Sequence, residues 1–162
     1  MNLLNNIKYI SKLLHLPIYE LSRLAPRDKR VWLFGSTFGR RFADNPRYLY
    51  NYICMNSKEL GIYPMWISDN RDIVKYLNSH HFPACYKRSL KGAFYALRGG
   101  VYFYDNYSKD INFPLSGGAV KVNMWHGIPL KKIQHDNIHD SFRHPENTIS
   151  RIKNFPRNIS DE

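Results

Sequence analysis

Short apolar runs alternate with segments of helical spacing along most of the chain. Runs rich in aromatic and β-branched residues, typical of strands, fall at 31–34, 64–69, 101–104 and 120–125, with a shorter one at 84–86. Between them, apolar residues recur at the spacing of one helical face. Strands that alternate with helices predict an α/β fold: a doubly wound, Rossmann-like parallel sheet with helices on both faces.

The predicted helices have recognisable start and stop signals. Asp44 and Asn45, followed by a proline at the first helical position, predict the start of a helix that Gly61 closes. Ser89 is expected to cap a later helix that ends at the glycine pair 99–100. A shorter helix is expected around 73–77.

The order of these elements also predicts where a ligand binds. In sheets of this type, ligands sit at the carboxyl ends of the strands. The loops after Phe34, Tyr104 and Trp125 are therefore expected to meet near one cleft.

The first part of the chain has an apolar stripe of its own. Its members share helical spacing on either side of Pro17, which is expected to end or restart the helix: Leu3, Leu4, Ile7, Ile10, Leu13, Leu14, Ile18, Leu21 and Leu24. A stripe flanked by Lys and Arg fits a membrane interface, and it fits equally a helix packed on its own domain. We expect an amphipathic helical segment over 1–28 as the candidate to face a membrane, a Rossmann-like domain over 29–145, and a tail or truncated linker over 146–162.

The net charge of the chain narrows the class of partner that we expect it to bind. The chain of 162 residues has 24 Lys and Arg against 13 Asp and Glu, a formal net charge of +11. Such a balance favours an anionic partner. No nucleic-acid-binding signature is present and the basic residues are spread along the sequence, so we do not expect nucleic acid. A phosphate-rich substrate and an anionic membrane surface remain.

Cysteines and hydropathy add two expectations. Cys54 and Cys85 lack zinc-finger spacing, and a reduced, cytosolic compartment is the simplest interpretation. No run approaches the roughly 20 apolar residues that span a bilayer, and the start of the chain does not resemble a signal peptide.

The strongest chemical motif follows the last predicted strand. His126 stands just past a strand end, where its imidazole can take a proton from a hydroxyl at neutral pH. Gly127 allows close approach of a substrate, and Lys131 and Lys132 add charge near a helix start suited to phosphate. Asp136 is placed to orient the imidazole. A structural histidine is the competing interpretation.

Two weaker patterns were weighed beside it. His135 and His139 are four residues apart and would share a helical face, as metal ligands do, but the glutamate of an HExxH site is lacking. We assign no metal ligand and expect no cofactor. The loop from Gly35 to Arg41 follows a strand without matching a nucleotide-binding fingerprint. Candidate contacts to an acceptor or phosphate from this region are Ser36, Arg40, Asp44 and Asn45, the last two of which would also serve as helix caps.

Three ordered segments together resemble one protein family. Residues 31–36 and 42–50 are similar to its opening strand and its F-x-DN-x-(K/R)-Y-L helix start. Residues 89–92 through 101–105 are similar to the helix and strand that follow. Residues 123–133, with Asp136, resemble its WHG-x-P-x-K signature. The family is that of the CDP-glycerol glycerophosphotransferases, which includes teichoic-acid primases and polymerases and related capsule enzymes.

The resemblance implies a fold and a reaction. It implies one half of a two-domain GT-B type, glycosyltransferase-like fold, in which the N-terminal domain meets a lipid-linked polyol-phosphate acceptor. His126 would deprotonate the acceptor hydroxyl, and glycerol phosphate would move from CDP-glycerol with CMP as the leaving group. The resemblance also implies a peripheral protein on the cytoplasmic face of the cell membrane.

The resemblance covers only the first part of the family's catalytic region. CDP-glycerol is therefore expected to bind only through a missing C-terminal half or a partner chain. The alternative is a non-catalytic, membrane-associated module, or a truncated remnant, that binds anionic lipid or polymer.

Overall fold

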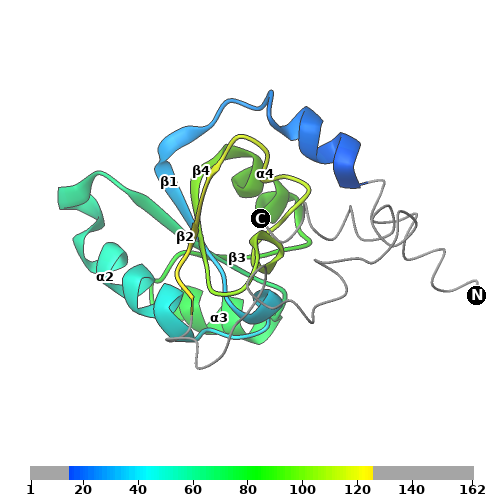
Figure 1. The fold of residues 1–162 in the computed structure, drawn as a ribbon. Helices are drawn as coiled ribbons and strands as arrows, with labels where there is room; N and C mark the ends of the chain where they lie inside the picture. The colour runs from blue at the N-terminus through cyan, green and yellow to red at the C-terminus, as the bar shows by residue number, and fades with distance from the viewer. Residues whose placement is uncertain (1–14, 126–162) are drawn as a thin grey trace, which may run out of the picture.

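The computed structural model describes residues 15–125 of the chain. A parallel five-stranded sheet forms the centre of this part, with the strand order β3-β2-β1-β4-β5 (Figure 1). The strands are β1 (Asp28–Phe34), β2 (Tyr63–Ser68), β3 (Ala84–Tyr86), β4 (Gly99–Tyr104) and β5 (Val120–Asn123). Every strand pair is parallel, so the predicted α/β sheet is confirmed.

Helices connect the first four strands. They are α2 (Asp44–Leu60), α3 (Arg71–Ser79) and α4 (Leu90–Arg98), with short 3-10 turns η1 (Thr37–Gly39) after β1 and η2 (Ser108–Asp110) after β4. The Ser89 side chain accepts a hydrogen bond from Gly92 N–H, as its predicted role as a cap requires. Gly61 closes α2 in the left-handed conformation that favours glycine.

Two local expectations differ from the structure. α2 begins at Asp44 with Ala43 at the N-cap, and no side chain caps it. Asp44 and Asn45 thus lie inside the first turn, where they make tertiary contacts instead. β5 ends at Asn123 rather than at Trp125. Residues 15–22 are helical with Pro17 in the first described turn, which agrees with a helix that restarts there, and the residues before 15 lie outside the described part.

Apolar clusters cover both faces of the sheet. On one face α2 and α3 pack over large rings and branched chains, namely Phe34, Tyr50, Ile53, Trp66, Leu77, Ala84 and Phe103. On the other face the strands contribute Leu33, Ile67 and Tyr102, against which Tyr95 of α4 packs. The alternating faces of β1, β2 and β4 fill both cores, as expected for a sheet buried on both sides.

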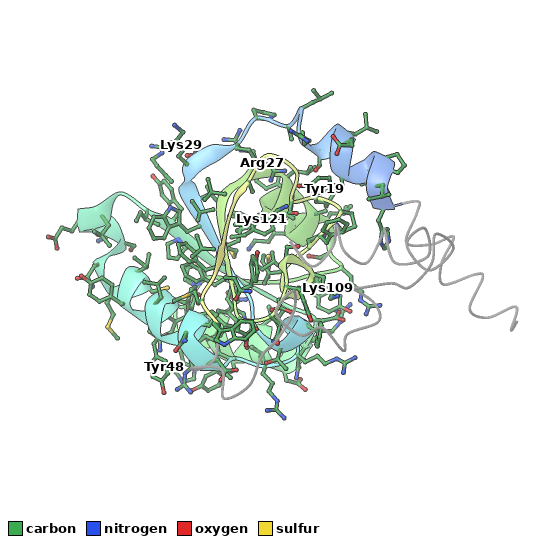
Figure 2. All side chains as sticks on the ribbon, viewed as in Figure 1. Tyr19, Arg27, Lys29, Tyr48, Lys109 and Lys121 are labelled. Atoms are coloured by element: carbon green, nitrogen blue, oxygen red, sulfur yellow. The ribbon has the colours of Figure 1, made fainter. Side chains whose placement is uncertain are left out.

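The helix of residues 15–22 packs on the domain with one side only. Tyr19 stacks on Phe113 with ring centroids 5.1 Å apart and accepts a hydrogen bond from Lys121 Nζ at 2.8 Å (Figure 2). Ser22 Oγ accepts from Gly117 N–H at 2.9 Å. Leu21 and Leu24 point away from these contacts and are 67% and 82% exposed. This segment therefore supports both interpretations of the apolar stripe, a helix packed on its own domain and a membrane interface.

Arg27 joins that helix to the sheet. Its guanidinium lies among backbone carbonyls from three parts of the chain and donates hydrogen bonds to the oxygens of Ser22, Ala96, Gly99, Leu115 and Gly117. A planar, five-donor group suits this convergence of acceptors.

Candidate active-site edge

The loops after β1 and β4 meet at the carboxyl edge of the sheet. Thr37 N–H donates to Asp105 Oδ1 at 2.9 Å, and Phe38 N–H donates to Asp110 Oδ1 at 2.9 Å. The end of β5 joins them, because Asn123 Nδ2 donates to Asn106 O at 3.2 Å. The predicted meeting is confirmed for the loops after Phe34 and Tyr104, whereas the loop after Trp125 lies outside the described residues.

This edge is where backbone strain is concentrated. Of the five non-glycine residues with positive φ within 15–125, four lie here, namely Thr37, Phe38, Asp44 and Trp125. Such conformations persist only where surrounding contacts enforce them, and they tend to cluster at functional sites. The strained positions mark the same loops that the strand order selects.

Two buried carboxyl groups hold the first two loops together. Asp105 and Asp110 are both fully buried. Burial and the neighbouring Asp105 carboxyl raise the pKa of Asp110 to about 6. Burial opposes ionisation of Asp105 too, but hydrogen bonds from Asp110 and from Thr37 N–H hold the pKa of Asp105 below its ordinary value. Two ionised carboxylates would repel each other at this distance. A proton held by Asp110 and shared with Asp105 removes that repulsion and allows the contact.

Sequence reasoning missed this acid pair. Asp105 belongs to the segment that resembles the family, yet we gave it no role, and Asp110 went unnoticed. The available signal was the position of Asp105 directly after a buried strand, at the edge where polar side chains gather. Nothing in the sequence showed that Asp110 turns back onto it through η2.

Asn45 fixes the end of β5. Its side-chain amide donates to Met124 O at 3.0 Å and to Trp125 O at 2.8 Å. Trp125 N–H in turn donates to Asn123 Oδ1 at 3.0 Å, and Met124 N–H donates to Tyr104 O at 2.7 Å. The backbone is therefore tied on both sides up to the residue that precedes His126. We call the pair of bonds from Asn45 the Asn45 clamp.

Three other residues that we predicted to contact an acceptor or phosphate lie in the described part, namely Ser36, Arg40 and Asp44. Ser36 is fully buried, and its hydroxyl lies 3.1 Å from Thr37 Oγ1 and interacts with the Asp105 carboxyl. Arg40 is exposed, and Asp44 interacts with Asp105. These roles stay predictions. His126, Gly127, Lys131, Lys132 and Asp136 lie outside the described residues.

The two cysteines pack in or against the apolar clusters. Cys54 and Cys85 are both free, and burial raises the pKa of Cys54 and raises that of Cys85 to about 11. Neither is a reactive thiolate at neutral pH. Between residues 15 and 125 no three His, Cys, Asp or Glu side chains gather closely enough to hold a metal ion. The histidines at 135 and 139 lie outside this range. The described helices include none long and apolar enough to cross a membrane.

Comparison with known proteins identifies the class that this fold and edge represent. The model of the family "CDP-Glycerol:Poly(glycerophosphate) glycerophosphotransferase" matches residues 18–161, and the chain belongs to that family. The expected family is thus confirmed on nearly the whole sequence.

Two individual relatives support the assignment to this family. The chain is 29% identical over 146 residues to a teichoic acid poly(glycerol phosphate) polymerase of Bacillus spizizenii, covering 88% of this chain and 36% of that protein. It is 27% identical over 126 residues to a teichoic acid glycerol-phosphate transferase of Staphylococcus aureus, covering 76% and 31%. The chain thus spans about a third of the length of these relatives.

Solved structures support the fold. A structure of the wall teichoic acid polymerase TagF matches with a TM-score of 0.56 at 18% identity, over 95% of this chain and 37% of that one. A TagF variant soaked with CDPG matches with a TM-score of 0.51 at 15% identity. The shared fold is the Rossmann-like half that the strand pattern predicted.

Proposed function

We propose that this chain is the acceptor-side half of a glycerophosphotransferase that extends a lipid-linked acceptor of the teichoic-acid or capsule type. Membership of the glycerophosphotransferase family supports the reaction class. The observation that carries the assignment of the site is the Asn45 clamp, which fixes the backbone directly before His126 at the ligand-binding edge.

In the proposed reaction His126 accepts the proton of the acceptor hydroxyl. The hydroxyl oxygen attacks the phosphorus of CDP-glycerol that bears glycerol. A new O–P bond forms, the bond from that phosphorus to CMP breaks, and CMP leaves with the bonding electrons. Asp136 holds the imidazolium that develops, and Gly127, Lys131 and Lys132 face the acceptor phosphate.

We assign CDP-glycerol to a C-terminal half outside this sequence or to a partner chain. One supporting point is that the matched TagF structures are much longer than this chain, and one of them was soaked with CDPG. The domain described here would then supply the base and the acceptor surface.

We place the protein on the cytoplasmic face of the membrane, as a peripheral protein. Ile18, Leu21 and Leu24 present an apolar stripe on the outer side of the first described helix, and the chain is strongly cationic. Apolar area together with positive charge suits an anionic lipid surface. The same stripe also favours the second candidate, a non-catalytic module that binds anionic lipid or polymer.

Replacement of the proposed base separates the two candidates. The chain is completed with the donor half of a teichoic acid polymerase relative, and CMP release and polymer growth are measured. His126→Ala is expected to lower the rate by about 10² to 10⁴. His80→Ala, on the exposed end of α3, serves as the control and should keep the rate.

Near-normal turnover of His126→Ala would remove the assignment of the base. If the completed wild-type enzyme shows no transfer while the chain still binds anionic vesicles, the binding module becomes the better account.

A further inference from the structure

A cavity of about 610 Å³ lies beside the active-site edge. The segments around it are the first described helix, the start of α4, and η2 with the turn that follows. Its lining divides into a cationic set and an apolar set, namely Lys87, Arg88 and Lys109, and Leu90, Ala93, Phe113 and Pro114, with His15, Ser89 and Asn112 between. The volume is within the range of about 300–1,000 Å³ that small-ligand sites occupy.

The cationic side chains are held in place by specific contacts. Lys87 Nζ donates a hydrogen bond to Lys109 O across the cavity wall. The Arg88 guanidinium donates two hydrogen bonds to Asp69, at 2.8 and 2.7 Å. The Lys109 ammonium sits over the ring of Tyr107, 4.1 Å from its centroid. Side chains fixed in this way lose little further entropy when they bind an anion.

The backbone at Lys87 is equally constrained. A Cβ added to Gly92 would lie 2.3 Å from Tyr86 O and 2.9 Å from Lys87 O, so the first turn of α4 rests directly on this segment. That contact needs a glycine, and it fixes the position of Lys87 relative to the start of α4. The N-terminal end of α4, whose dipole favours anions, faces the same side of the cavity through Ser89 and Leu90.

The described charged side chains that line the cavity are all cationic, although Asp69 pairs with Arg88 from outside the lining. No Asp or Glu is among the residues, within the described part, that line it. Burial lowers the pKa of Lys87, because the ammonium is largely removed from water, while the nearby Asp69 and Asp110 act in the opposite direction. The apolar wall of Leu90, Phe113 and Pro114 would pack against carbon atoms of a ligand. Asn112 Nδ2 can donate a hydrogen bond to a ligand hydroxyl. An organic phosphate ester satisfies both sides, whereas a bare anion satisfies only one.

We infer that this cavity binds a glycerol phosphodiester, with the phosphate at Lys87 and Lys109 and the glycerol carbons on the apolar wall. The inference deepens the proposed function and rests on it for the identity of the ligand. Two sources share this chemistry: a unit of a poly(glycerol phosphate) acceptor, and the headgroup of phosphatidylglycerol. In the first case the cavity would hold the acceptor chain beside the edge that carries His126.

Binding to this chain, without any donor nucleotide, tests the inference. The probes are a short poly(glycerol phosphate) oligomer, phosphatidylglycerol vesicles with phosphatidylcholine vesicles as reference, and inorganic phosphate. The oligomer or the phosphatidylglycerol vesicles should bind saturably and perturb the amide NMR signals of 87–93 and 109–114. Which of the two does so names the source. Inorganic phosphate should bind at least tenfold more weakly.

Variants localise the site. Lys109→Gln is expected to weaken binding about tenfold or more, since it removes a charge-assisted hydrogen bond. Ala93→Leu fills the apolar side, keeps every charge, and should also weaken binding. Lys29→Gln, at the amino end of β1 and distant from Lys109 in Figure 2, removes the same charge as a control and should bind like the wild type.

An equal loss of binding affinity in Lys29→Gln and Lys109→Gln would overturn the inference, because it would indicate general attraction between the cationic chain and an anion. Unchanged binding in both cavity variants, or inorganic phosphate binding as tightly as the ester, would overturn it as well. The proposed function fails separately, when His126→Ala keeps its transfer rate whatever the cavity binds.

Discussion

The α2–α3 face of the sheet and its carboxyl edge are built by different interactions. On the α2–α3 face, rings pack on rings: Trp66 is fully buried, 4.7 Å from Phe42 and 5.4 Å from Tyr50 between centroids. At the carboxyl edge, buried carboxyl groups and an amide tie strained loops together through hydrogen bonds. Apolar packing sets the stability of the domain, and polar contacts set the position of the site.

The difference implies that the two regions respond to different perturbations. Packing of apolar rings is insensitive to pH and contributes in proportion to the area removed from water. A shared proton and a donated amide depend on protonation and on single atoms. The predictions for Trp66, Asp110 and Asn45 each alter one of these regions, and one further prediction concerns the first described helix.

The largest effect on stability is expected from Trp66→Ala. Loss of this buried ring leaves a cavity between α2 and the sheet, and should lower the free energy of unfolding by about 3–5 kcal/mol. Chemical denaturation measures the change. Tyr63→Ala, on the same strand but 59% exposed, should cost much less. Similar losses in both variants would contradict the role given to the aromatic core.

The carboxyl edge should make stability depend on pH. The pKa of Asp110 is about 6 in the folded protein, against an ordinary value of 3.8. The folded state therefore binds more protons between these values, and the free energy of unfolding should fall as pH rises from about 4 to 6. The fall is on the order of 2–3 kcal/mol. Asp105, whose pKa is lowered, acts in the opposite sense only below about pH 4.

Asp110→Asn should flatten that profile, whatever its effect on absolute stability, because the titrating group is gone. Denaturation at pH 4.5 and 7.5 measures the difference for each variant. Asp72→Asn, an exposed carboxylate on α3, should keep the wild-type difference. A wild-type profile without this fall would mean that the two carboxyl groups do not share a proton.

A smaller effect is expected at the first described helix. Leu21→Ser with Leu24→Ser should leave the melting temperature nearly unchanged, since both side chains are largely exposed. Flotation with anionic vesicles should nevertheless weaken, and wild-type binding should itself decrease with salt. Flotation that ignores lipid charge, salt and both substitutions would argue against a membrane role for this stripe.

The two regions also differ in how far the sequence predicts them. The strands and helices follow from apolar spacing, glycine stops and the Ser89 cap, and the structure confirms them because burial of apolar faces dominates the fold. The carboxyl edge was predicted only as a location. Asn45 was expected to cap a helix or contact an acceptor, and its amide binds the two residues that follow β5, about eighty residues away. Contacts of this range depend on the assembled fold.

The acid pair shows the same limit. A carboxylate after a strand is a common pattern, and its partner Asp110 reaches it only because η2 reverses the chain. The family resemblance succeeded where spacing alone could not, because it reads several segments together. It covered residues 31–136, and the family match covers 18–161.

The central claim is that the polar edge holds the backbone that presents His126, and the transfer rate of Asn45 variants tests it most directly. In the completed enzyme, Asn45→Ala should lower kcat about tenfold, with the KM for CDP-glycerol unchanged. The reason is loss of two hydrogen bonds, each contributing about 1 kcal/mol, that fix Met124 and Trp125.

Two comparisons make the result specific. Asn45→Asp lacks the amide donor and should be no better than the alanine variant. Asn56→Ala removes an amide on the same helix that donates to Tyr52 O, and should leave kcat as in the wild type. The account predicts slow transfer by both Asn45 variants and wild-type kcat in Asn56→Ala, with all three variants folded at the assay temperature. Wild-type kcat in Asn45→Ala would contradict it.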